Sequence, residues 1–279
     1  MTAPLLDVRD LQVTFGKGER AVQAVRGVSF ELGRERLAIV GESGSGKSVT
    51  VRSLLGLAGP SANVTAAHAS FRGADLLSAT SRQIRSIRGD GIAMVVQDPR
   101  HGLNPLRTVS QQIEEMIVRA PRRSGTAAKT RLLELLDDVH IRDPERVSHL
   151  YPHQLSGGMA QRVMIAMMMA REPDVLIADE ATSALDVPVQ QRILEIIDEQ
   201  VRRRGMGLIL ISHDLDLVAS YSDRTIVMYA GRIVDSFASN AAGAPGRHPY
   251  TRGLIACRPS LSHPGGVLPT LQRDPAWLE

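Results

Sequence analysis

The sequence predicts an α/β fold built around a mostly parallel β-sheet. Short apolar runs that end at glycine or polar residues recur along the chain, and amphipathic stretches with helical spacing separate them. Parallel strands read as continuous apolar runs because helices cover both faces of the sheet. In folds of this kind the ligand binds at the carboxyl ends of the strands. We therefore look for functional residues directly after the apolar runs.

The elements follow one another in a consistent order. Residues 11–15 and 28–32 alternate apolar and polar side chains, which predicts antiparallel strands. The expected strands of the parallel sheet are residues 37–40, 92–96, 175–178, 208–211 and 225–229. Residues 190–204 have the spacing of a helix with one apolar face.

Two regions interrupt this alternation. Residues 98–162 look helical, for example at 109–119 and 127–139, and show no clear strand, which predicts an inserted helical subdomain. After residue 236 the composition shifts to Ala, Gly, Pro and Ser, which is typical of a linker followed by a short tail. We expect an α/β core at 1–97 and 163–235, a helical subdomain at 98–162, and a C-terminal extension at 236–279.

Composition excludes several classes of protein. The chain has 279 residues, of which 43% are hydrophobic and 23% charged, as in globular proteins. No apolar run approaches the roughly 20 residues of a membrane-spanning helix, and no secretory signal is expected at the N-terminus. The single cysteine, Cys257, excludes an internal disulfide, and no cysteine cluster offers a zinc or iron–sulfur site. These features predict a cytoplasmic location.

Nucleic acid is not an expected partner. The net charge of +3 is modest, and the 3% aromatic content leaves little for the stacking platforms of single-strand binders.

A glycine-rich motif follows the expected strand at 37–40. Its residues are Gly41, Glu42, Ser43, Gly44, Ser45, Gly46, Lys47 and Ser48, which fit G-x-x-x-x-G-K-S/T, and a helix is expected at 49–57. Glycines let the backbone N–H groups and the helix N-terminus surround an anion. Lys47 is then placed to reach the β- and γ-phosphates, and Ser48 to hold Mg²⁺. A chance glycine-rich turn is the alternative, and the motif by itself indicates only a nucleotide phosphate site.

Two carboxylates follow the expected strand at 175–178. Asp179 is suited to bind Mg²⁺ through the water shell of the metal. Glu180, one residue later, is suited to orient or deprotonate an attacking water. An acidic pair at a strand end is often only a solvated turn, but the glycine-rich motif favours the catalytic interpretation.

Residues 155–162 read Leu-Ser-Gly-Gly-Met-Ala-Gln-Arg. With the motifs above, this segment resembles the signature of ATP-binding-cassette (ABC) ATPases, and the resemblance extends over about residues 5–235. Gln97 resembles the glutamine loop, residues 183–186 resemble the segment after the carboxylates, and His213 resembles the switch histidine. Phe15 stands where the family often stacks an aromatic ring on adenine.

The resemblance implies the fold of a P-loop NTPase cassette, with a RecA-like parallel core and an antiparallel β subdomain. It also implies ATP and Mg²⁺ as ligands, and catalytic roles for Gln97 and His213 besides Lys47 and Glu180. Gln97 is expected to contact Mg²⁺ and the attacking water, and His213 the γ-phosphate. The residues that precede the helix expected at 159–170 would face a nucleotide held by a partner subunit; they are Ser156, Gly157 and Gly158.

The tail narrows the resemblance further. Residues 247–254 read Arg-His-Pro-Tyr-Thr-Arg-Gly-Leu and resemble the C-terminal extension of the oligopeptide, dipeptide and nickel importer ATPases. This implies an ATP-hydrolysing subunit of a bacterial importer for peptides or nickel-type substrates. The implied partners are two membrane-spanning permease subunits, a second and usually non-identical ATPase subunit, and an extracytoplasmic solute-binding protein. The implied location is the cytoplasmic face of the inner membrane.

Three departures from the family pattern bear on these expectations. Ala181 stands where proline is usual after the catalytic glutamate, and Ala160 stands where this subfamily often has arginine, but neither removes a phosphate ligand. The lone Cys257 predicts that the iron–sulfur cluster of many relatives is missing. Two alternatives stay open: a soluble cassette ATPase that acts on DNA or ribosomes, and a non-catalytic regulatory subunit. The regulatory alternative would need a degenerate carboxylate or signature.

Overall fold

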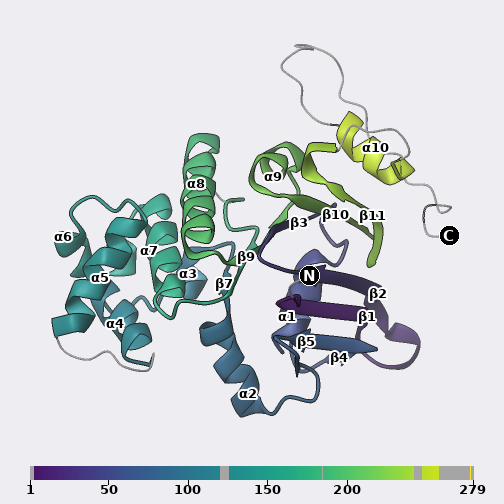
Figure 1. The fold of residues 1–279 in the computed structure, drawn as a ribbon, viewed down its shortest axis with the longest axis horizontal. Coiled ribbons are helices and arrows are strands. Elements are labelled where there is room, and N and C mark those ends of the chain that lie inside the picture. The colour runs from purple at the N-terminus through teal and green to yellow at the C-terminus, as the bar shows by residue number, and fades with distance from the viewer. Residues whose placement is uncertain (1–2, 120–125, 184, 242–246, 258–276, 278–279) are drawn as a thin grey trace. The chain divides into compact units, whose positions relative to one another are not determined.

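The computed structural model describes residues 3–119, 126–183, 185–241, 247–257 and 277 (Figure 1). The chain divides into two compact units: Met1–Ser78 with Ser212–Glu279, and Ala79–Ile211. The first unit takes segments from both ends of the chain, and the second is one continuous segment.

The first unit contains an antiparallel sheet around its N-terminal strand. Its members are β1 (Leu6–Phe15), β2 (Val22–Leu32), β4 (Ala62–Thr65), β5 (His68–Phe71) and β6 (Ala74–Asp75). β1 pairs with β2, β4 and β5, and a short 3-10 turn, Gly18–Arg20, leads toward β2. The expected antiparallel pair is confirmed, and both strands are longer than the alternation predicted.

The first unit also contains part of the parallel sheet. β3 (Arg36–Val40) runs parallel to β10 (Arg224–Tyr229), and β11 (Arg232–Ala238) pairs antiparallel with β10. The helices are α1 (Lys47–Leu54), α9 (Leu215–Tyr221) and α10 (Pro249–Ala256), with a 3-10 turn at Ser239–Ala241. β11 continues past residue 236, where the linker is expected to start. Most of the side chains of β11 are half-buried or exposed. Such a strand can carry polar residues, and no continuous apolar run marks it in the sequence.

The second unit contributes three parallel strands. β8 (Val175–Asp179) pairs with both β7 (Ile92–Val95) and β9 (Gly207–Ser212), whose last residue falls in the first unit. All five strands expected for the parallel sheet are confirmed, with ends shifted by one residue at most. The side chains of β8 are all buried, which explains why this strand was read as one apolar run.

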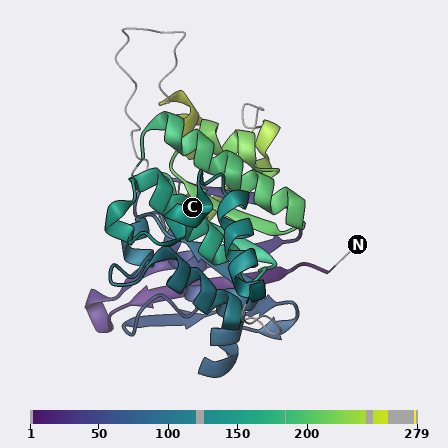
Figure 2. The ribbon, with the colours of Figure 1, turned by 90° about the vertical axis from the view of Figure 1, so that its left-hand side faces the viewer.

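Helices make up most of the second unit. They are α2 (Ser81–Ser86), α3 (Pro99–Gly102), α4 (Val109–Arg119), α5 (Thr126–Asp138), α6 (Pro144–Ser148), α7 (Gly157–Met169) and α8 (Val187–Arg204), with short turns at Ile87–Gly91 and Pro152–Gln154. The residues described between 98 and 162 contain α3 to α6 and the start of α7, and no strand, as expected. α4, α5 and α7 pack against one another (Figures 1 and 2).

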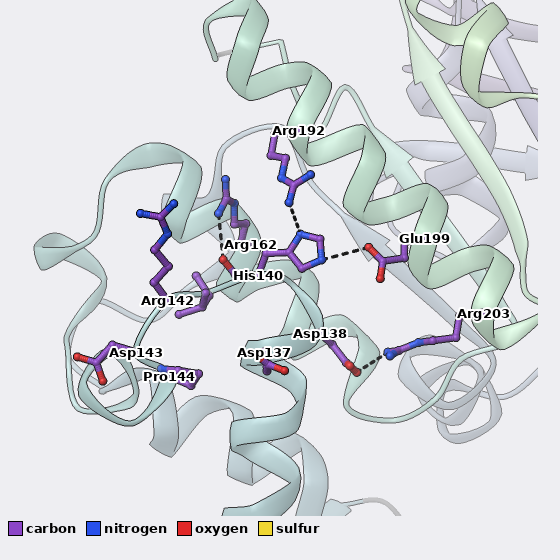
Figure 3. Close-up of a pocket in the computed structure, with 11 residues that line it drawn as sticks. Asp137, Asp138, His140, Arg142, Asp143, Pro144, Arg162, Arg192, Glu199 and Arg203 are labelled. Atoms are coloured by element: carbon purple, nitrogen blue, oxygen red, sulfur yellow. Dashed lines mark hydrogen bonds and ion pairs between the residues drawn. The ribbon is translucent and has the colours of Figure 1, made fainter.

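A hollow of about 760 Å³ lies in the second unit, where the end of α5 and the start of α6 meet α7 and α8 (Figure 3). Several of its lining side chains are paired across these elements. The Nδ1 of His140 accepts a hydrogen bond from Arg192, and its Nε2 lies 3.2 Å from a carboxylate oxygen of Glu199. The backbone of His140 has a positive φ of 57°. Asp138 forms ion pairs with Arg203 and Arg204 of α8, at 2.6 and 3.1 Å. These pairs connect the end of α5 and the loop that follows it to α8.

Asp138 makes the stability of this junction depend on pH. Burial opposes ionisation of this carboxyl, but the hydrogen bond and charge of Arg203, with the charges of Arg204 and Arg131, outweigh it and lower its pKa. Because the pKa of Asp138 is lower in the folded than in the unfolded state, its ionised form stabilises the fold at every pH above the unfolded pKa. This stabilisation is lost as the pH falls through the pKa of the folded state.

We expect Asp138→Asn to destabilise the chain by about 1–3 kcal/mol at pH 7, because a charged hydrogen bond is removed. Thermal unfolding followed by circular dichroism at several pH values measures this effect. The difference from wild type should shrink as the pH falls through the pKa of Asp138. Asp137→Asn, an exposed neighbour on the same helix, is the matched control, and an equal loss in both variants contradicts the assignment.

Candidate functional site

The glycine-rich loop connects β3 to α1, as expected. Gly41, Gly44 and Gly46 have φ values of +152°, +82° and +100°, a region that favours glycine. A Cβ at Gly41 would lie 2.2 Å from the Met228 carbonyl oxygen, and one at Gly46 would lie 2.6 Å from that of Ala24. Both glycines are therefore required by conformation and by the close approach of neighbouring backbone.

Lys47 is buried beneath this loop, with 4% of its surface exposed. Its Nζ donates hydrogen bonds to the carbonyl oxygens of Gly41 at 2.8 Å and Glu42 at 2.9 Å. These carbonyls hold the ammonium group against the loop, where it is placed to reach a phosphate bound by the loop N–H groups. Ser45 Oγ is also buried and has no hydrogen-bond partner among the described residues. Such a hydroxyl suits a polar ligand in the loop.

The N-terminus of α1 faces the end of the loop. Gly46 is the N-cap residue, and the first turn, which contains Ser48, carries no acidic side chain. The positive end of the helix dipole is therefore not neutralised within the helix. Glu42, Ser43, Gly44 and Ser45 help to line a small hollow of about 190 Å³. The loop has the geometry of an anion site.

The two carboxylates lie at the end of β8. Asp179 is the last residue of the strand and is 1% exposed. Glu180 is half-buried and has a positive φ of 49°, which is strained for a residue with a side chain. Its N–H donates to the Ile211 carbonyl at 3.1 Å, and its carbonyl accepts bonds from the Ser183 N–H and hydroxyl, both at 3.1 Å. These bonds hold the unusual backbone that sets the direction of the Glu180 side chain.

Gln97 leaves the same edge of the sheet as Glu180. β7 and β8 are parallel, with Val95 opposite Ala178, and Gln97 and Glu180 each lie two residues beyond this pair. Gln97 is exposed and is therefore accessible to a ligand. The strand ends at Val95, so Gln97 starts the loop rather than ending the strand, and α3 lies within that loop.

Gln161 connects the loops that follow these two strands. This residue of α7 is completely buried, and its Nε2 donates to the Ala181 carbonyl at 2.7 Å and to the Val96 carbonyl at 3.5 Å. The signature helix is thereby fixed to the backbone beside Glu180 and Gln97. Sequence reasoning did not select Gln161, although an amide among the apolar residues of α7 could have indicated it.

The signature residues open α7. Ser156 is the N-cap, and its hydroxyl accepts a hydrogen bond from the Met159 N–H at 3.3 Å. Gly157 and Gly158 follow as the first helical residues, and the first turn has no acidic side chain. A Cβ at Gly158 would lie 2.9 Å from Cγ1 of Val189, so glycine allows close packing on α8. Ser156 and Gly157 are exposed, so this helix terminus is accessible.

The remaining predicted residues belong to the first unit. His213 is exposed and follows β9, next to Asp214, whose carboxylate accepts a hydrogen bond from the Leu217 N–H at 3.0 Å. Phe15 is half-buried at the end of β1, opposite Val22 of β2. The glycine-rich loop also belongs to the first unit, whereas Gln97, the carboxylates and the signature belong to the second. The ligand contacts of all these residues stay predictions.

The chain matches known proteins over most of its length. Residues 25–183 match the ABC transporter family. The dipeptide transport ATP-binding protein DppD of Bacillus subtilis is 45% identical over 276 residues, which cover 98% of this chain and 82% of the relative. The oligopeptide transport ATP-binding protein OppD of the same organism is 44% identical over 263 residues, 94% of this chain and 74% of the relative.

Solved structures agree with the fold. The ATP-binding cassette MJ0796, in a dimeric post-hydrolysis state bound to ADP and Pi, has a TM-score of 0.74 and 25% identity, and the match covers 84% of this chain and 98% of that one. None of the described helices combines the length and apolar character needed to cross a bilayer. With its P-loop fold, its ordered motifs and these relatives, the chain belongs to the ABC transporter family.

Proposed function

We propose that this chain is the ATP-hydrolysing subunit of an ABC importer for di- or oligopeptides. The observation that carries the proposal is the intact catalytic strand end, where Glu180 follows the buried Asp179, in a chain that closely resembles peptide transport ATP-binding proteins. A regulatory subunit that does not hydrolyse ATP would need neither carboxylate. The relatives described above are named for peptides, so we favour peptides over nickel-type substrates.

ATP would bind through the glycine-rich loop. The loop N–H groups and the α1 N-terminus would bind the β- and γ-phosphates, and Lys47 would add its positive charge. Phe15 would stack on the adenine. The glycine conformations of the loop and the buried ammonium group support this part of the proposal.

The donor set also suits a magnesium ion. Ser48, Asp179 and Gln97 offer a hydroxyl, a carboxylate and an amide oxygen, the hard ligands that Mg²⁺ prefers. Within the described residues, no group of three or more His, Cys, Asp or Glu side chains could hold a metal ion. This agrees with an ion that takes other ligands from water and the nucleotide. When bound, it would neutralise charge on the phosphate oxygens.

Hydrolysis would follow an in-line displacement. The oxygen of a water molecule forms a bond to the γ-phosphorus while the bond from this phosphorus to the β–γ bridging oxygen breaks, which gives ADP and phosphate. Glu180 would accept the proton of the attacking water, and Gln97 would orient that water. His213 would contact the γ-phosphate, and Lys47 would stabilise the charge on the transferred group.

A second cassette would complete each site. Ser156, Gly157 and Gly158 form an accessible helix terminus that would donate N–H groups to ATP bound by the other subunit. Two ATP molecules would then lie at the interface, so that binding closes the pair and hydrolysis opens it. The partner cassette is proposed to be a related but different chain.

The remaining partners follow from the proposed transport role. Two membrane-spanning permeases would convert closure of the ATPase pair into transport, and an extracytoplasmic binding protein would deliver the peptide. The chain would lie at the cytoplasmic face of the inner membrane. We also propose that residues 1–97 with 163–235 act as the ATP-binding core, residues 98–162 as the signature subdomain, and residues 236–279 as an extension.

Transport by the assembled complex tests this function. The chain is reconstituted in proteoliposomes with its permeases, second cassette and binding protein, and uptake of a labelled dipeptide is measured with and without ATP. We expect uptake that depends on ATP and is accompanied by phosphate release. Nickel ions serve as the alternative substrate. Phosphate release without peptide uptake would contradict the substrate class, and no phosphate release would contradict the enzymatic role.

A further inference from the structure

The motif His248-Pro249-Tyr250 in the C-terminal extension directs one aromatic side chain at the glycine-rich loop. Tyr250 lies in the first turn of α10 and is completely buried. Its hydroxyl accepts a hydrogen bond from the Glu42 N–H, with 2.9 Å between nitrogen and oxygen. The two residues are 208 positions apart in the sequence. The sequence alone gave this tyrosine no role beyond the family resemblance of its segment.

The hydrogen bond involves a particular peptide group of the loop. The N–H of Glu42 and the carbonyl of Gly41 belong to the same planar unit, and in a trans peptide they point in opposite directions. The Gly41 carbonyl accepts a hydrogen bond from Lys47 Nζ at 2.8 Å, while the N–H on the other side donates to Tyr250. Tyr250 and Lys47 therefore hold one peptide plane from opposite sides. A rotation of this plane would displace the carbonyl that positions the ammonium group.

The start of α10 is anchored to β11. The carboxylate of Asp235 forms an ion pair with Arg247 at 3.2 Å and accepts the His248 N–H at 3.0 Å. The Arg247 guanidinium lies 4.1 Å from the ring centroid of Phe237, and His248 caps the helix by accepting the Tyr250 N–H on Nδ1 at 3.1 Å. Since these contacts fix the helix start on the strand, the direction of Tyr250 is set by structure outside the loop.

The tyrosine ring is also held by other aromatic rings. The ring centroids of Tyr229 and Tyr250 are 4.5 Å apart, and Trp277 lies 5.8 Å from each. This packing restricts the ring while the hydroxyl reaches the loop. Thr251, the next residue of α10, is also completely buried, and its Oγ1 has no hydrogen-bond partner among the described residues. Of these two neighbouring hydroxyls, that of Tyr250 bonds to Glu42.

We propose that Tyr250 is a positioning residue for ATP: its hydroxyl fixes the Gly41–Glu42 peptide, and through it the ammonium group of Lys47. The C-terminal extension is then a structural part of the nucleotide site, and its anchorage at Asp235 sets the affinity for ATP. This inference rests on the proposed function, because it assumes that the loop binds ATP. Removal of the hydroxyl takes away the hydrogen bond between Tyr250 and the Glu42 N–H, so the peptide plane loses one of the two contacts that orient it.

Tyr250→Phe tests the hydrogen bond directly in the otherwise complete chain, assembled with its partner subunits. We expect the Kd and KM for ATP to rise about tenfold, with kcat changed by less than about twofold, because Lys47 contacts the phosphates before and during the reaction. The matched control is Thr251→Val, which removes the buried hydroxyl of the neighbouring residue and should bind ATP like wild type. Thermal unfolding of both variants shows whether the fold is retained.

Asp235→Ala provides a second test that leaves the tyrosine in place. It should raise the KM for ATP in the same direction, because the start of α10 loses its anchor. The inference is overturned if Tyr250→Phe and Thr251→Val have equal ATP affinity, whether both match wild type or both are weakened. A wild-type complex that binds and hydrolyses ATP keeps the proposed function intact in that case, whereas loss of ATP binding by the wild type would overturn the function itself.

Discussion

Replacement of Glu180 by glutamine is expected to abolish turnover while MgATP still binds. Glutamine keeps the shape and hydrogen-bonding capacity of the side chain but cannot accept a proton from water. General-base catalysis contributes about 10²–10⁴-fold to a rate, so kcat should fall by at least about 100-fold. The Kd for ATP should change little, because the proposed phosphate contacts of the glycine-rich loop, His213 and the signature do not involve the Glu180 side chain.

Single-turnover phosphate release and equilibrium nucleotide binding separate these two effects. Glu172→Gln is the matched control, since Glu172 also has a positive φ, of 55°, but is exposed after α7. This control should hydrolyse ATP at the wild-type rate. Near-normal hydrolysis by Glu180→Gln would remove Glu180 from its role as the base. A large loss of ATP binding would instead indicate that the left-handed backbone at 180 collapses without the carboxylate.

Lys47→Ala is expected to weaken ATP binding itself. Hydrogen bonds to charged groups contribute about 1.5–3 kcal/mol each, which corresponds to a rise in Kd of roughly 10- to 150-fold. The change also removes the two hydrogen bonds that Lys47 Nζ makes to the Gly41 and Glu42 carbonyls. Part of the loss therefore comes from a less ordered loop, and thermal unfolding without nucleotide measures that part.

Titration with a fluorescent ATP analogue measures the affinity of this variant. Lys17→Ala, a change at an exposed lysine of the same unit, should leave the Kd unchanged. An unaltered affinity in Lys47→Ala would count against the glycine-rich loop as the phosphate site. If both lysine variants lost affinity equally, the effect would be one of net charge rather than of position.

Local patterns were sufficient for the parts of the site that lie within one strand–loop–helix segment. The glycine-rich loop was predicted with its strand and helix because the spacing of Gly41, Gly46 and Lys47 reflects the backbone that surrounds a phosphate. The order of the other motifs then indicated the family. The strands that lead to Gln97 and Glu180 were predictable for a similar reason, since continuous apolar runs mark buried parallel strands.

Contacts between distant segments could not be predicted in this way. β11 pairs with β10 through backbone hydrogen bonds and has no apolar run, so composition alone made part of it a linker. The left-handed backbone of Glu180 depends on the carbonyl of Ile211, and the role of Gln161 depends on two loops brought together by β7 and β8.

The sequence by itself predicted the phosphate loop, the paired carboxylates and the signature, because each is a short segment whose residue types carry its chemistry. Only the tertiary structure decided that Tyr250 supports the loop through Glu42 and that Asp138 joins α5 to α8. Hydrogen bonds and ion pairs of this kind depend on where folding brings two distant side chains, and neither partner's local sequence specifies the other.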